Sequence, residues 1–286
     1  PSALFFVLAM PYYWAKVHPL VPLVALFFFV LTVCCLLAAC FADPGIIPRR
    51  EVILATNSAE RLKRELGYNV LGDPAPSVTA LGMSRNPSGV NMMVPVELRS
   101  KGYCWCTSCK IVRPPRASHC ADCDNCVLRF DHHCPFVNNC VGQRNYHFFF
   151  GFITSVLILA MLVIPSILIF TSAISTEVTV HRMSQVSSAM WIFFWGLALC
   201  SFLIIVAALL SFVLWAYHVY LIATKKTTKE FRKSIPNVGE EPTLCAARGP
   251  RLFDPRELVD PADLTRPDQD NTRSNTGDGW VSRSGP

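Results

Sequence analysis

Apolar residues in this chain are concentrated in three long stretches. Residues 17–42, 145–176 and 183–224 contain no Asp, Glu, Lys or Arg over 26, 32 and 42 positions. Each stretch exceeds the roughly 20 apolar residues that a helix needs to cross a bilayer core of about 30 Å. The third lacks the polar turn that two crossings would require, so we expect one long helix there, with its core at residues 191–215. The pattern predicts a mainly α membrane protein.

A shorter apolar stretch, residues 3–14, opens the chain and is too short to span a bilayer by itself. The chain starts at Pro1 rather than Met, so we expect an N-terminal truncation that cuts into a first transmembrane helix. A signal peptide is the alternative, but no basic segment or small-residue cleavage site accompanies the stretch. With this partial helix included, the sequence predicts four transmembrane helices.

Basic residues give the expected orientation. Residues 43–146 carry 13 Lys and Arg and the segment from Lys225 carries 11, whereas the other two connections hold only Lys16 and Arg182. Cytoplasmic loops near membrane spans are enriched in Lys and Arg. The central segment and the tail are therefore expected on one side, the cytosol.

Composition agrees with a membrane protein, since 52% of the residues are hydrophobic and 16% are charged. The net charge of +6 is explained by topology and by attraction to anionic lipid, so no nucleic-acid partner is expected. Low aliphatic content predicts disorder in the tail from Arg266.

The chain is predicted to divide into five segments. They are residues 1–42 for the first (partial) and second helices, 43–103 for a cytosolic connection, 104–146 for a cysteine-rich domain, 147–224 for the third and fourth helices and 225–286 for a partly disordered cytosolic tail.

Eight of the 13 cysteines fall within residues 104–140, together with three histidines. In the reducing cytosol such a cluster favours metal over disulfides. Zinc prefers four thiolate or imidazole ligands, and a two-residue gap lets a cysteine pair reach one ion. Three pairs have this gap: Cys106 and Cys109, Cys120 and Cys123, and Cys123 and Cys126.

Two closed zinc sites need eight ligands, so three of the eleven candidates are left over. Cys104 precedes the first pair and is interpreted as structural or incidental. The other surplus lies in Asp131, His132, His133 and Cys134. Adjacent side chains on an extended strand point to opposite faces, so if His133 faces a zinc, His132 faces away and can meet Cys134. That arrangement would give a thiol, an imidazole to take its proton and the Asp131 carboxylate to orient the imidazole. The alternative is that Cys134 is a further ligand of a structural finger.

The tetrapeptide at residues 131–134, within this cysteine pattern and beside membrane spans, resembles the DHHC family of protein palmitoyltransferases. The resemblance extends over nearly the whole chain. It includes Asp43-Pro44-Gly45, residues 106–140, Asn145 with Phe149, and Thr227-Thr228-Lys229-Glu230. Residues 113–120 are similar to the branch that contains the Ras palmitoyltransferases. Phe136 stands where many members have Trp, and the tail shows no convincing copy of the family's aromatic and Asn motif.

The resemblance implies a small cytosolic domain of short β-hairpins that holds two structural Zn²⁺ ions. The implied ligands are Cys106, Cys109, His119 and Cys126 for one ion and Cys120, Cys123, His133 and Cys140 for the other. It also implies that a palmitoyl group passes from palmitoyl-CoA to Cys134 and then to cysteines of other proteins. His132 would be the general base and Asp131 the residue that orients it. The alternative function is a zinc-organised membrane adaptor without catalysis, which would need the same ligands but not Cys134 or His132.

Further expectations concern the acyl donor. Arg113, Arg116, Arg144 and Lys225 are candidates to attract the phosphates of CoA. A sixteen-carbon chain spans roughly 15 Å, or about 10 residues of helix. Counted from Phe149, this places its end near Leu159 and Ala160. The expected partners are acyl-CoA, the lipid bilayer and membrane-associated proteins with cytosolic cysteines, and an accessory subunit is left open. The expected location is the Golgi, the endoplasmic reticulum or the plasma membrane.

Overall fold

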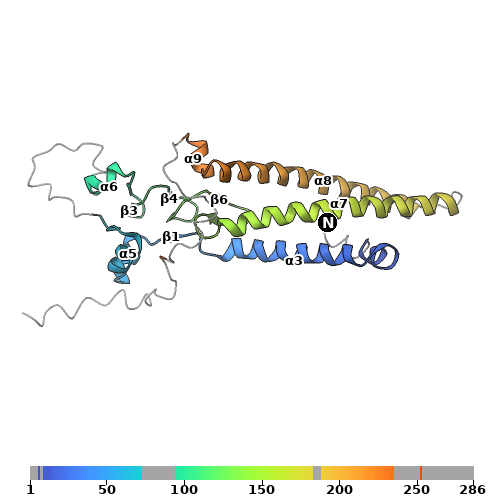
Figure 1. The fold of residues 1–286 in the computed structure, drawn as a ribbon, viewed down its shortest axis with the longest axis horizontal. Coiled ribbons are helices and arrows are strands. Elements are labelled where there is room, and N and C mark those ends of the chain that lie inside the picture. Colours follow the sequence, from blue (N-terminus) through green and yellow to red (C-terminus); the bar gives the residue numbers. More distant parts are fainter. Residues whose placement is uncertain (1–5, 7–8, 73–93, 183–187, 235–251, 253–286) are drawn as a thin grey trace, which may run out of the picture.

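The computed structural model describes residues 6, 9–72, 94–182, 188–234 and 252. Three long helices run side by side at one end of the molecule, and short strands and helices form a small domain at the other end (Figure 1). Among the long helices, α7 lies between the other two and contacts both. They are α3 (Leu20–Phe41), α7 (Tyr146–Arg182) and α8 (Ser188–Ala223).

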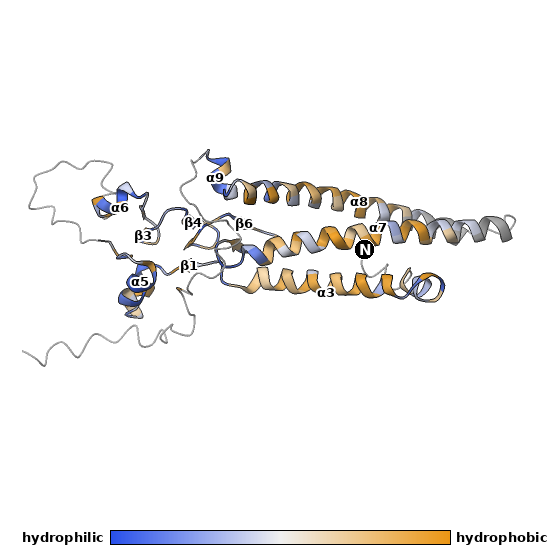
Figure 2. Ribbon diagram, viewed as in Figure 1, coloured by the Kyte–Doolittle hydropathy of each residue, from blue (hydrophilic) through white to orange (hydrophobic). Residues whose placement is uncertain are grey.

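The described residues contain three helices that are long and apolar enough to cross a membrane: Leu20–Phe41, Tyr146–Ala173 and Ala198–Ala223. Figure 2 shows this hydrophobic character along most of α3, α7 and the adjoining part of α8. The third stretch is a single helix, α8, as predicted, and among the described residues its candidate span is Ala198–Ala223.

The prediction of four transmembrane helices is not confirmed, because three candidate spans are found among the described residues. Much of the expected first helix lies outside those residues. The part described is the short helix α2 (Met10–Tyr12) followed by a π-helical turn, η2 (Tyr13–Val17). This segment packs against α7, where the Tyr13 hydroxyl donates a hydrogen bond to the carbonyl of Ser166 over 3.0 Å. The predicted disorder from Arg266 also concerns residues outside the described ones.

The small domain is built on three antiparallel hairpins that follow one another along the chain. The second hairpin is extended to three strands by β1, so that the sheet order is β1-β5-β4. The strands are β1 (Ile46–Ile47), β2 (Cys104–Cys106), β3 (Ile111–Arg113), β4 (Ser118–Cys120), β5 (Asn125–Val127), β6 (His132–Cys134) and β7 (Asn139–Val141).

The turns of the three hairpins are alike. In each, the residue just before the second strand has a left-handed backbone: Lys110 (φ 51°), Asp124 (φ 49°) and Asn138 (φ 47°). Left-handed backbone at one residue lets a short turn reverse the chain. The first strand of each hairpin also ends in a cysteine. The domain therefore repeats one local unit three times.

Short helices complete the domain. Leu62 of α5 and Ile53 of α4 are fully buried in a core that also takes in the first hairpin and, from the tail, Leu252. The helices are α4 (Arg50–Ala55), α5 (Ala59–Leu66), α6 (Val96–Ser100) and α9 (Thr228–Arg232).

The third hairpin is fastened to the end of α3. The Asn139 amide Nδ2 lies 3.0–3.1 Å from the carbonyl oxygens of Ala39, Cys40 and Ala42. The last carbonyls of a helix have no partner within the helix, so this contact satisfies groups that would otherwise need water. Nearby, an added Cβ on Gly142 would lie 2.5 Å from the carbonyl oxygen of Pro44, so only glycine permits this approach. The hairpin that carries Cys134 therefore lies directly at the ends of two membrane helices, α3 and α7.

Candidate functional site

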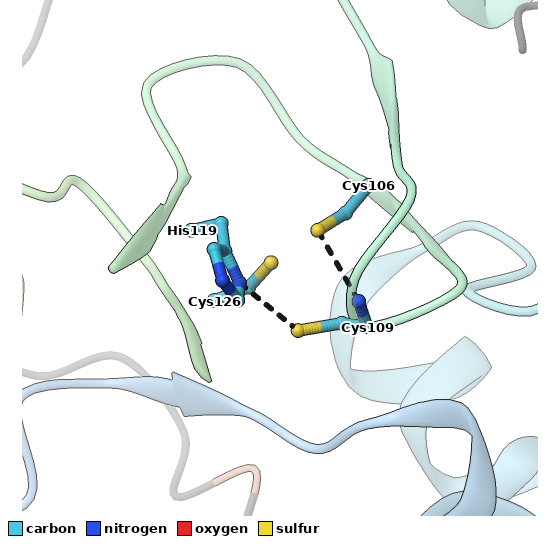
Figure 3. A group of neighbouring side chains, drawn as sticks. All are labelled: Cys106, Cys109, His119 and Cys126. Carbon is cyan, nitrogen blue, oxygen red and sulfur yellow. Dashed lines mark hydrogen bonds between the residues drawn. The ribbon is translucent and has the colours of Figure 1, made fainter. Parts of the chain in front are cut away.

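One group of metal-binding side chains joins the first and second hairpins. Cys106, Cys109, His119 and Cys126 point toward one another from β2, its turn, β4 and β5 (Figure 3). Their ligand atoms all lie within 4.8 Å of one another. Cys109 Sγ is 3.3 Å from His119 Nδ1.

A second group joins the second and third hairpins, with Cys120, Cys123, His133 and Cys140 again within 4.8 Å of one another. Cys123 Sγ lies 3.4 Å from His133 Nδ1 and 3.5 Å from Cys140 Sγ. The middle hairpin contributes two residues to each group, so the two groups interleave along the chain.

Both groups suit zinc. Bonds of about 2.3 Å to sulfur and 2.0–2.1 Å to nitrogen in a tetrahedron put neighbouring ligand atoms roughly 3.3–3.8 Å apart, close to the distances observed. The thiols of each group lie so close together that their negative charges would repel, so all of them can be deprotonated at once only around a cation. Interactions with Cys126 and His119 lower the pKa of Cys109 to about 5, while the neighbouring Cys109 thiol and burial raise the pKa of Cys126. Each group thus has the donor set and the spacing of a closed four-ligand site.

Cys104 is outside both groups. It is exposed, and its Sγ lies 3.6 Å from the carbonyl oxygen of Gly102. Its strand partner is Arg113 of β3. The residue interpreted as structural or incidental is therefore exposed and belongs to neither metal-binding group.

Cys134 occupies the end of β6 that Cys106 and Cys120 occupy in the other hairpins. In those hairpins the residue three positions later is a cysteine, but here it is Val137, which is buried beside Cys134. In the first hairpin the N–H of Cys109 donates to Cys106 Sγ over 3.4 Å. Val137 and Phe136 supply equivalent backbone N–H groups to the thiol of Cys134. The third turn thus has the form of a metal-binding turn with one of its two ligands missing.

His132 and Asp131 are the next parts of the site. Because side chains alternate along β6, His133 turns to the second metal group and His132 turns away from it. His132 Nδ1 lies 2.6 Å from Asp131 Oδ2. Burial alone would lower the pKa of His132, but its interactions with Asp131 and Cys134 raise it to about 9. Burial alone would raise the pKa of Cys134, but contacts with His132 and the backbone N–H groups hold it below its usual value.

Thr228, at the start of α9, fixes the Asp131 carboxylate. Its N–H donates to Asp131 Oδ1 over 2.8 Å and its hydroxyl donates to Oδ2 over 2.7 Å. With His132, these donors hold the pKa of Asp131 below its usual value although burial would raise it. No role was predicted for Thr228 from its place in the sequence. The Thr227-x-x-Glu230 capping pattern predicts the start of a helix, but which carboxylate that helix meets depends on the tertiary fold.

Arg116 was predicted to attract CoA phosphates, but the structure gives it another partner. Its guanidinium makes a bidentate contact with the Glu230 carboxylate, at 2.6 and 2.8 Å, and both side chains are less than 10% exposed. Glu230 also completes the capping box of α9 with Thr227. Arg116 therefore fastens α9 to the cysteine-rich domain. Arg144 likewise pairs with Asp43, with 3.3 Å between Nε and Oδ2.

Cations do gather elsewhere, around a polar pocket of about 610 Å³ beside His132. Lys229, Arg232 and Lys233 line it, and none of them was predicted. A second pocket, of about 380 Å³, shares Lys229 and Lys233 with the first and is lined by Arg113 and Arg116 too. Of the four predicted phosphate-binding residues, Arg113 and Arg116 thus line the second pocket, whereas Arg144 and Lys225 are not among the described residues that line either.

An apolar cavity of about 780 Å³ lies between α7 and α8. Ala160 lines it, together with Ile164 and Leu209 farther along. Leu159 instead packs against the cluster that contains Ala9 and Tyr13. Adjacent helical residues point about 100° apart, so only one of the two predicted cavity residues faces this space.

One end of the cavity borders the buried cluster to which Cys134 belongs. Trp215 and Thr154 line its near end, and the Trp215 indole N–H donates to the Thr154 hydroxyl over 3.1 Å. Trp215 also packs against the buried cluster that contains Cys134, Phe149 and Ile153. The thiol and the cavity therefore border one packed group of side chains.

Comparison with known proteins agrees with this geometry. Residues 99–235 match the DHHC palmitoyltransferase family. The chain is similar to palmitoyltransferase ZDHHC14 of Homo sapiens, with 35% identity over 237 residues that cover 80% of this chain and 43% of the relative. Palmitoyltransferase ZDHHC18 of Homo sapiens is 35% identical over 80% of this chain and 53% of its own length, and ZDHHC9 of Danio rerio is 34% identical over 80% and 54%.

The chain thus spans about half the length of the curated relatives it matches. The matched residues contain all three hairpins, both metal-binding groups, Cys134 and α9. Residues 99–235 are therefore a DHHC palmitoyltransferase domain.

Proposed function

We propose that this protein is an S-acyltransferase that takes a long-chain acyl group, such as palmitoyl, onto Cys134 and passes it to cysteines of other proteins. The observation that carries the proposal is that Cys134, His132 and Asp131 are joined to one another but lie outside both metal-binding groups. A purely structural finger has no use for such an arrangement.

The reaction would proceed in two steps. In the first, the Cys134 thiolate attacks the thioester carbonyl of acyl-CoA, the carbonyl's bond to the CoA sulfur breaks, and CoA leaves as a thiol with a proton from His132. In the second, His132 takes the proton of the incoming substrate thiol, whose sulfur attacks the acyl carbonyl. The bond from that carbonyl to Cys134 Sγ then breaks, and Cys134 leaves as the thiolate. Asp131 would keep His132 in the tautomer that places its remaining nitrogen toward Cys134.

The two zinc ions would support this site without reacting. A zinc ion closed by four protein ligands supplies folding energy and leaves no position for substrate. Because His133 belongs to the second group and lies between His132 and Cys134, metal binding there would hold both neighbours in place.

The acyl-CoA donor would lie across the membrane boundary. The acyl chain would occupy the apolar cavity between α7 and α8, which borders the buried cluster that contains Cys134. The phosphates of CoA would bind in the polar pocket beside His132, where Lys229, Arg232 and Lys233 supply positive charge. This assignment replaces Arg116 and Arg144, whose guanidinium groups are paired with carboxylates.

The acceptors would be membrane-associated proteins. The third hairpin is fastened to the end of α3, so Cys134 lies at the level of the membrane boundary, where only cysteines near the bilayer can reach it. The excess of basic residues around the site supports a cytosolic orientation. The proposed location is an endomembrane or the plasma membrane.

The test uses the purified full chain in detergent with radiolabelled palmitoyl-CoA. We expect label on the protein that hydroxylamine removes, as it removes a thioester, and that Cys134→Ser abolishes. Cys104→Ser is the matched control and should label as the parent does. A parent chain that takes no label, or a Cys134→Ser variant that loses a zinc ion, would exclude the proposal in favour of a structural adaptor.

A further inference from the structure

Two buried polar side chains of the membrane helices meet close to His132. Tyr146 begins α7, and His218 lies in the last two turns of α8. The Tyr146 hydroxyl and His218 Nδ1 are 2.9 Å apart, and the two residues are 2% and 1% exposed. In an apolar setting each group would be costly to leave without a partner, so the hydrogen bond ties α7 to α8 at this level.

His218 of this pair also packs beside the His132 ring. The His132 ring lies 6.0 Å from the ring of His218 and 5.3 Å from that of Phe149, measured between centroids. Phe149 in turn meets His218 edge to face at 5.1 Å. His132 is therefore held by a hydrogen bond to Asp131 and by packing against Phe149 and His218.

The two constraints also lie close together in the chain, at the end of α8 and the start of α9. His218 lies ten residues before Thr228, which donates two hydrogen bonds to Asp131. A shift of α8 relative to α7 would thus displace both the packing of the His132 ring and the partner of the carboxylate that orients it. The Tyr146–His218 hydrogen bond opposes that shift.

We infer that Tyr146 and His218 are positioning residues for the acyl transfer: they hold the His132 ring in the orientation that keeps Nδ1 on Asp131 and the other nitrogen toward Cys134. The inference rests on the proposed function. Since His218 acts through His132, it changes the rate of the chemical step without binding the donor.

The variants separate the hydrogen bond from the volume of the side chain. Tyr146→Phe removes only the hydroxyl, and His218→Leu removes its hydrogen-bond partner. His218→Asn places an amide oxygen where Nδ1 was, so it is the conservative variant. Tyr220→Phe, at a half-exposed position on the same helix, is the matched control.

The measurement is the rate of hydroxylamine-sensitive acylation in a single turnover, at a series of palmitoyl-CoA concentrations, with zinc content determined on the same samples. We expect Tyr146→Phe and His218→Leu each to lower the maximal rate roughly tenfold, about the effect of one lost hydrogen bond. The concentration for half-maximal rate and the zinc content should stay unchanged. The double variant should be no slower than either single one, because both remove the same interaction. His218→Asn should recover most of the rate.

Three results would overturn the inference. One is a maximal rate that is unchanged in Tyr146→Phe and His218→Leu. Another is a rise in the half-maximal concentration alone, since that would place the pair in donor binding. The third is a His218→Asn variant as slow as His218→Leu with its zinc intact. Failure of the proposed function is distinguishable, because the parent chain would then take no label before any variant is compared.

Discussion

Cys134 and Val137 occupy the two turn positions that Cys106 and Cys109 occupy in the first hairpin and Cys120 and Cys123 occupy in the second. The third hairpin keeps the backbone N–H groups that face the first cysteine but has a valine in place of the second. This relationship explains how one cysteine in a metal-binding fold remains available for chemistry.

Restoring the second cysteine should therefore restore metal binding in the third turn. Val137→Cys changes the side-chain volume little and gives Cys134 a partner at the two-residue gap that soft metals use. We expect added Cd²⁺ or Zn²⁺ to inhibit acyl-enzyme formation by Val137→Cys and a chelator to reverse that inhibition. Val137→Ala is the control. Equal metal sensitivity in the parent chain and in Val137→Cys would show that the turns are not equivalent.

Two zinc ions per chain are expected from the two four-ligand groups. Cys109→Ser should lower the zinc content by one ion through the first group, and Cys123→Ser should do so through the second. Both should lower the unfolding temperature of the cysteine-rich domain, because a closed site supplies folding energy. Elemental analysis and thermal unfolding measure the two effects, with Cys104→Ser as the variant expected to change neither. One zinc ion or none in active parent protein would contradict the prediction.

Thr228 should contribute to the rate through Asp131. Thr228→Val keeps the shape and the N–H of the residue but removes the hydroxyl that donates to Asp131 Oδ2 over 2.7 Å. A hydrogen bond to a charged group contributes about 1.5–3 kcal/mol, so we expect acylation to slow by roughly ten- to a hundredfold. Thr228→Ser, which retains a hydroxyl, should remain within a few-fold of the parent. If single-turnover rates of the two variants were equal, the hydroxyl would have no part in the reaction.

The length of acyl chain that the protein accepts should depend on Ala160 and not on Leu159. Ala160 lines the cavity between α7 and α8, so Ala160→Phe should fill part of it and shift preference toward shorter acyl-CoAs. Leu159 faces the segment around Tyr13, so Leu159→Trp should leave the preference unchanged and serves as a control of similar bulk. Competition among acyl-CoAs of different lengths measures the profile. A profile altered by Leu159→Trp but not by Ala160→Phe would move the end of the chain to the other face of α7.

The sequence by itself indicated the membrane character, the supply of ligands for two metal sites and the surplus that includes Cys134. The first follows from uncharged length and the others from counting cysteines and histidines in one short segment. Which ligands share an ion was implied by the family resemblance and not by spacing, since Cys123 and Cys126 have the two-residue gap but belong to different groups. The hairpins also depend on local turns, and the structure contains the short β-hairpins that the family resemblance implied.

The tertiary structure alone decided which long-range partners meet. Arg116 and Arg144 read as free cations in the sequence, but folding brings each to a carboxylate, and the pairing of Arg116 with Glu230 joins residues 114 positions apart. Thr228 reaches Asp131 only because α8 returns the chain to the cysteine-rich domain. Leu159 and Ala160 are neighbours and both are apolar, and the packing of α7 between α3 and α8 gives them different surroundings. Local spacing determines the hairpins and the supply of metal ligands, whereas the packing of the helices determines which side chains from distant parts of the chain meet.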